Sequence, residues 1–67
     1  MITITINGER RELPQSLVFT ELVDTLGLRG KRIAVERNGE IVPRSQFANA
    51  RVADGDTLEI VVAVGGG

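Results

Sequence analysis

The chain has 67 residues, a formal net charge of −1 and 42% hydrophobic residues, values that are typical of one small globular domain. The absence of cysteine excludes disulfides and thiolate nucleophiles, and the absence of histidine removes the commonest general base and metal ligand. Mixed charges and only two aromatic residues argue against a nucleic-acid interface, and the longest apolar run, Ile60 to Val64, is too short to cross a membrane.

The first part of the chain has the pattern of a tight hairpin. Residues 2–6 read Ile-Thr-Ile-Thr-Ile, and this alternation predicts a strand with the three isoleucines on its buried face. Asn7-Gly8 favours a two-residue turn because both positions tolerate positive φ, and the returning strand should cover Glu9 to Leu13 before Pro14. Because the strand pattern starts at residue 2, we expect no signal peptide and a cytoplasmic protein.

The apolar period then changes to that of an amphipathic helix between Val18 and Leu26. Its apolar stripe consists of Phe19, Leu22, Val23 and Leu26. Gly27 is placed where helices commonly end in a left-handed residue, and Ser16 is the best side chain available for the N-cap.

Two further strands and an aperiodic segment follow. Ile33 and Val35 alternate with polar residues in a third strand that should end at Asn38-Gly39. Residues 40–42 predict a short strand closed by a proline, and residues 44–53 have no clean period. Phe47 and Val52 are the expected core residues of that aperiodic segment.

The last strand should run over residues 57–64, after the turn Asp54-Gly55-Asp56, which we interpret as a turn and not a metal site. Its high hydrophobicity predicts a place in the middle of the sheet, with both faces at least partly covered. If Leu58 and Ile60 face the helix, Val61 faces outward on the other side of the sheet.

This order of elements predicts an α+β fold, in which one helix packs across one face of a mixed sheet of four to five strands. The first and last strands are the natural parallel central pair, because the helix supplies the crossover between them. We expect a single domain over residues 1–64 and a flexible glycine tail over residues 65–67.

Three glycines at positions 65–67 are the candidate functional segment. Gly65 and Gly66 have no side chain to add to a core, but they can thread a narrow channel in a partner enzyme, and the tail reaches about 10 Å when extended. The α-carboxylate of Gly67 would become reactive after adenylation, and a sulfur nucleophile could then leave a thiocarboxylate. The alternative is that the glycines are a frayed end or a cloning remnant.

A docking surface for partners is expected beside this tail. Val61, Ala63 and Val64 would form a small apolar patch there. In the alternative, Val62 and Val64 complete the core and Val61 is an isolated exposed valine.

Four segments resemble the thiamin-biosynthesis sulfur carrier family, whose members have a ubiquitin-like β-grasp fold. They are Asn38-Gly39-Glu40-Ile41-Val42-Pro43-Arg44, Asp54-Gly55-Asp56, Leu58-Glu59-Ile60-Val61 and Val64-Gly65-Gly66-Gly67. The resemblance covers essentially the whole chain. The Gly-Gly end is shared by all ubiquitin-like carriers, whereas the first segment and the ending are more specific to the thiamin branch.

The resemblance implies a carrier and not an enzyme. A partner E1-like adenylyltransferase would activate Gly67 with ATP and magnesium, both bound by that enzyme and neither by this chain. A persulfide enzyme would supply the sulfur, and thiazole synthase would accept it. The free carrier is expected to be a monomer.

Three alternatives remain open from the sequence. The chain could donate sulfur to another acceptor, such as the molybdopterin synthase system, whose small subunit is a similar β-grasp carrier. It could be a ubiquitin-like protein modifier joined to lysines through Gly67. It could also be a binding module with a passive tail, whose function would survive deletion of that residue.

Overall fold

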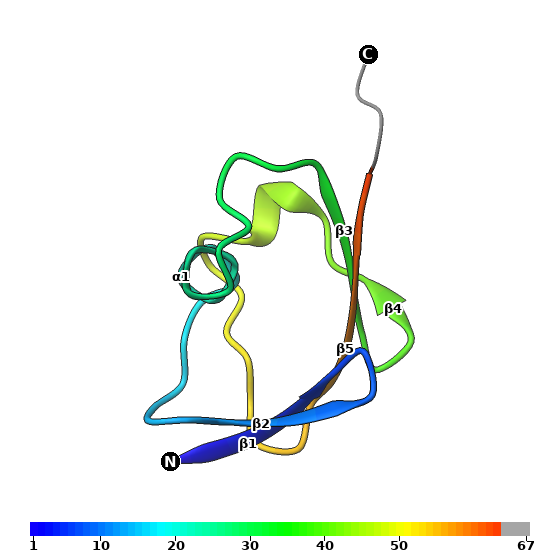
Figure 1. Cartoon of the computed structure of the whole chain (residues 1–67). Coiled ribbons are helices and arrows are strands. Elements are labelled where there is room, and N and C mark those ends of the chain that lie inside the picture. Colours follow the sequence, from blue (N-terminus) through cyan, green and yellow to red (C-terminus); the bar gives the residue numbers. More distant parts are fainter. Residues whose placement is uncertain (64–67) are drawn as a thin grey trace.

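Five strands form one mixed sheet, and a single α-helix lies across one of its faces in the computed structural model, which describes residues 1–63 (Figure 1). The elements in chain order are β1 (Ile2–Ile6), β2 (Glu9–Leu13), α1 (Phe19–Thr25), β3 (Ile33–Arg37), β4 (Glu40–Ile41), a 3-10 helix (Arg44–Gln46) and β5 (Thr57–Val62). This is the α+β arrangement predicted for a β-grasp fold. Within the described range, no helix has the length and hydropathy needed to span a membrane.

The strand order is β2-β1-β5-β3-β4, which places the last strand in the centre of the sheet. Strands β1 and β5 run parallel, with Thr5 in register with Thr57 and Ile6 with Leu58. The pairs β1–β2, β3–β4 and β3–β5 are antiparallel. The predicted central parallel pair is therefore confirmed.

Both predicted Asn-Gly turns are present and have the left-handed backbone that they require. Asn7 and Gly8 have φ values of 50° and 83°, and Asn38 and Gly39 have values of 51° and 88°. Positive φ at both central positions is the hallmark of the hairpin turn that matches strand twist. These turns fix the registers β1–β2 and β3–β4.

The core lies between α1 and the sheet. Phe19 and Leu22 of the predicted helical stripe are completely buried, and Phe47 and Val52 are the core residues of the aperiodic segment, as expected. The rings of Phe19 and Phe47 are 5.9 Å apart between centroids. The full core consists of Ile4, Ile6, Leu13, Phe19, Leu22, Val35, Phe47, Val52, Leu58 and Ile60.

The expected helix N-cap is wrong. The N-cap residue is Val18, whose backbone N–H donates to the Glu21 carboxylate at 3.2 Å. The Ser16 hydroxyl instead donates to the carbonyl oxygen of Val52 at 2.7 Å, and so it ties the loop before the helix to the segment that leads into β5. The expected C-terminal residue is correct, since Gly27 follows the helix with φ 76°.

The expectation that both faces of the last strand are at least partly covered is also wrong. Leu58 and Ile60 are buried under α1, but the alternate residues Thr57, Glu59 and Val61 are all exposed. The physical reason is that the described chain supplies one helix for one face of the sheet, which leaves the opposite face to solvent (Figure 1).

Candidate functional site

Strand β5 leads directly toward the glycines on which the predicted chemistry depends. Ala63 is the last described residue, and its N–H donates to the carbonyl oxygen of Arg32 at 2.8 Å, so β5 stays attached to the chain around β3 up to this point. The predicted sulfur-carrying Gly67, the threading residues Gly65 and Gly66, and the docking candidate Val64 lie outside the described residues.

The open face of the sheet carries apolar side chains close to this end of β5. Val61 is 64% exposed and Ile41 is 65% exposed. Ala34, the cross-strand partner of Val61, is exposed as well, and so is Ala63. Val61 and Ala34 are hereafter the open-face patch, and Ile41 lies two strands from Val61, in register with Glu36. The structure thus places the predicted outward residue Val61 on an exposed surface together with Ala34, which was not predicted.

Two carboxylates border the open-face patch. Glu36 and Glu59 lie directly opposite each other on β3 and β5. Like charges in this position destabilise a sheet, and the described ion pairs, Arg29–Asp24 and Arg37–Asp56, include neither of them. The patch therefore has a negatively charged border, which favours a partner surface with basic residues around an apolar centre.

Asp56 fixes the beginning of β5 and was predicted only as a turn residue. Its carboxylate is buried at 7% residue exposure. It accepts hydrogen bonds from the Ala53 N–H at 2.7 Å and from the Arg37 Nε at 3.0 Å, with a further bond from the Asn38 side chain at 3.2 Å. The Arg37 guanidinium also lies 5.8 Å from the Phe19 ring centroid. These contacts join β5 to the β3–β4 turn and to the core.

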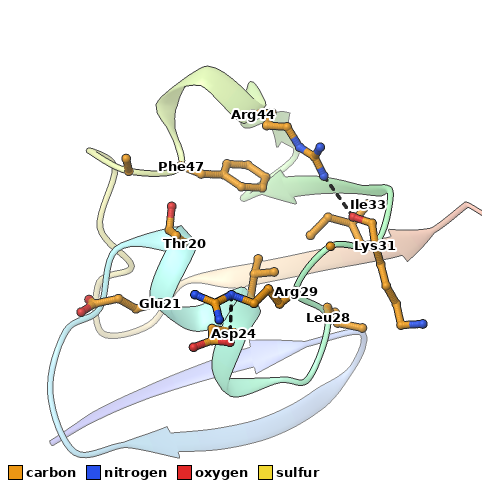
Figure 2. A pocket seen from close by; sticks show the side chains of 12 residues that line it. Thr20, Glu21, Asp24, Leu28, Arg29, Lys31, Ile33, Arg44 and Phe47 are labelled. Carbon is orange, nitrogen blue, oxygen red and sulfur yellow. Dashed lines mark hydrogen bonds and ion pairs between the residues drawn. The ribbon is translucent and has the colours of Figure 1, made fainter.

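A cavity lies elsewhere, between α1 and the segment around the 3-10 helix (Figure 2). It has a volume of about 440 Å³ and an apolar floor that includes Leu28, Ile33 and Phe47. One hydrogen bond and one ion pair fix charged side chains at the rim of the cavity. The Arg44 guanidinium donates to the Lys31 carbonyl at 3.0 Å, and Arg29 lies 3.6 Å from Asp24.

None of the functional-site residues predicted from the sequence lines this cavity, and its lining offers little for bond-breaking chemistry. Thr20 contributes a hydroxyl and Glu21 a carboxylate, but the sequence has no histidine or cysteine to activate a nucleophile. No group of three or more potential metal ligands gathers within residues 1–63. The arrangement around β5, which joins an exposed apolar patch to the strand that precedes the glycines, remains the better candidate site.

Comparisons with known proteins identify relatives of the whole chain. The model of the ThiS family matches residues 4–67. The chain is 48% identical over 64 residues to a thiazole synthase of Paramagnetospirillum magneticum; the match covers 96% of this chain but 20% of that protein. The chain thus spans about a fifth of the length of that relative. It is also 38% identical over 47 residues to the sulfur carrier protein ThiS of Bacillus subtilis, covering 70% of this chain and 71% of that protein.

A solved structure extends the agreement to three dimensions. The crystal structure of a thiamine biosynthesis protein (ThiS) from Geobacter metallireducens superposes with a TM-score of 0.84 at 35% identity. The match covers 98% of this chain and 100% of that one.

Proposed function

The chain belongs to the ThiS family, and we propose that it carries sulfur for thiamin biosynthesis on the carboxyl group of Gly67. The observation that carries this proposal is the extent of the family match, which reaches residue 67 and therefore includes all three glycines. In this proposal residues 1–64 form the folded carrier and residues 65–67 form the tail. Gly67 must then be the last residue of the working protein, because only a terminal residue has a free α-carboxylate.

The proposed cycle begins on a partner E1-like adenylyltransferase. A carboxylate oxygen of Gly67 attacks the α-phosphorus of ATP, pyrophosphate leaves, and an acyl-adenylate forms. The terminal sulfur of an enzyme persulfide then attacks the carbonyl carbon and AMP leaves. A second thiol breaks the sulfur–sulfur bond, which leaves a thiocarboxylate on Gly67 and a disulfide on the donor. Magnesium belongs to the ATP site of the partner, and this chain is a co-substrate.

Thiazole synthase is the proposed sulfur acceptor. Two relatives with that name, from Paramagnetospirillum magneticum and Magnetococcus marinus, contain a segment that is 48% and 31% identical to this chain. Holding a carrier and its acceptor in one polypeptide raises their effective concentration, which is the expected advantage for two modules that meet in every cycle. This supports a complex of the present chain with thiazole synthase.

Growth without thiamin tests the proposal in the cell. Deleting Gly67 should abolish growth in medium that lacks thiamin, and added thiazole should restore it. The full-length chain expressed at the same level is the control. Normal growth of the deletion strain without either supplement would contradict the proposal.

A further inference from the structure

The edge of β5 that faces β1 is open at its C-terminal end. Strand β5 pairs with β3 from Leu58 to Val62, whereas its pairing with β1 includes only Thr57 and Leu58. The central strand of the sheet therefore becomes an edge strand after β1 ends.

The hydrogen-bonding direction along β5 identifies the first open residue. Ala63 donates its N–H toward β3, to the carbonyl of Arg32, and backbone groups of successive strand residues point to opposite sides. The N–H and C=O of Val62 therefore point away from β3, to the same side as the Leu58 carbonyl, which accepts from the Asn7 N–H at 2.9 Å. Among residues 1–63, no residue is in register with Val62 on that side.

Asn7 sets the lower limit of this open edge. Its side-chain amide donates to the Ile60 carbonyl at 3.0 Å and accepts from the Ile60 N–H at 2.8 Å. The side-chain amide of Asn7 thus makes the two hydrogen bonds to β5 that the backbone of a further β1 residue would otherwise make. An unpaired strand edge is a template for another backbone, and in the described chain that template is the N–H and C=O of Val62.

A small cavity lies beside the same edge on the helix side of the sheet. It has a volume of about 230 Å³ and is lined by the apolar side chains of Ile6, Leu26, Leu28 and Val62, with Arg11 among the lining residues. Val62 lines this cavity and is 37% exposed. A residue paired opposite Val62 would point its side chain to the same face, into the cavity.

We propose that thiazole synthase binds this chain by strand addition, with an extended segment that pairs with the backbone of Val62 and places an aliphatic side chain in the cavity. The choice of partner rests on the proposed function. The segment also carries a carboxylate near Arg11, because that exposed guanidinium belongs to neither ion pair of the described residues. Main-chain hydrogen bonds provide the affinity in this mode of recognition, and the side-chain cavity provides the specificity.

Hydrogen exchange resolved to single amides tests the proposal on the full chain, alone and saturated with thiazole synthase. The Val62 amide should exchange roughly tenfold more slowly in the complex, as expected for one new hydrogen bond. The Ala63 amide already donates to Arg32 and should change less. A complex in which Val62 exchanges as fast as in the free chain would overturn strand addition but leave sulfur transfer intact. Failure of the complex to form would overturn both the partnership and this inference.

Two matched pairs of variants test the same contact by affinity. Val62→Pro removes the N–H on the open edge and leaves the hydrogen bonds between β5 and β3 in place. Val62→Ala keeps that N–H and shortens the side chain. Val62→Pro should bind thiazole synthase roughly tenfold more weakly than Val62→Ala. Arg11→Glu should also weaken binding, whereas Arg10→Glu, on the same strand but the opposite face, should not. Equal binding within both pairs would overturn the proposal, and the arginine pair decides if Val62→Pro does not fold.

Discussion

The side-chain amide of Asn7 hydrogen bonds to both backbone groups of Ile60, a residue 53 positions further along the chain. One residue thus forms the first hairpin turn with its backbone and extends the pairing of β1 with β5 through its side chain. The last strand before the glycines is held on this side by Asn7 and on the other side by β3.

Replacing Asn7 by glycine should separate these two roles. Glycine tolerates the φ value of 50°, so the turn can persist, but both bonds to Ile60 are lost. We expect the free energy of unfolding to fall by about 1–2 kcal/mol, measured by urea denaturation. Asn7→Asp keeps the acceptor but sets a second carboxylate oxygen against the Ile60 carbonyl oxygen, so it should lower the free energy of unfolding as well. An unchanged midpoint in Asn7→Gly would show that the contact does not stabilise the fold.

Asp56→Ala should destabilise the chain more than any change at its neighbour Asp54. The variant leaves the partly buried Arg37 without its carboxylate and removes the acceptor of the Ala53 N–H. We expect a loss of about 2–3 kcal/mol in unfolding free energy. Asp54→Ala removes one exposed bond to the Thr3 N–H and should cost less than about 1 kcal/mol. Equal losses in the two variants would contradict this ranking.

The like-charge pair on the open face makes a salt-dependent prediction. Glu59→Gln should raise the free energy of unfolding by a few tenths of a kcal/mol, roughly 0.2–0.5, because it removes repulsion from Glu36. The gain should shrink as salt is added, since both carboxylates are on the solvent-facing side of the sheet. Thermal unfolding at low and high ionic strength measures this, and a salt-independent gain would point to packing instead of charge.

Val61→Glu tests the open-face patch as a docking surface. Because Val61 is 64% exposed, its replacement should change the unfolding free energy by less than about 0.5 kcal/mol. Binding to the partner adenylyltransferase should weaken by about tenfold if the patch is a central contact, as titration calorimetry would show. Thr5→Glu, on the same face of neighbouring β1 and in register with Arg10, is the control and should bind normally. Normal binding by Val61→Glu would exclude the patch from this interface.

The strands, hairpin turns and helix were predicted well because each of their sequence patterns is typical of only one kind of element. Alternating isoleucines and the Asn-Gly pairs determined β1 and both hairpins, and the stripe containing Phe19 and Leu22 determined the helix. Ser16 was a poor guide to the N-cap, because its hydroxyl bonds to Val52, a residue that only the tertiary fold brings near.

Side-chain contacts that depend on the register between strands could not be predicted from the sequence. Asp56 has the pattern of an ordinary turn residue until β3 brings Arg37 beside it. Asn7 is explained fully by its turn, so nothing indicated its bonds to Ile60. The open edge at Val62 depends on where β1 stops relative to β5, which composition and period do not specify.

The intact mass of the full chain tests the central claim most directly. The protein would be incubated with the adenylyltransferase, ATP, magnesium, a persulfide-forming sulfur donor and a reducing thiol. The proposed function predicts a mass gain equal to the exchange of one oxygen for one sulfur, located at Gly67 and absent from a chain that lacks this residue. An unchanged mass with active partners, or a covalent adduct to a second protein in place of the exchange, would contradict it.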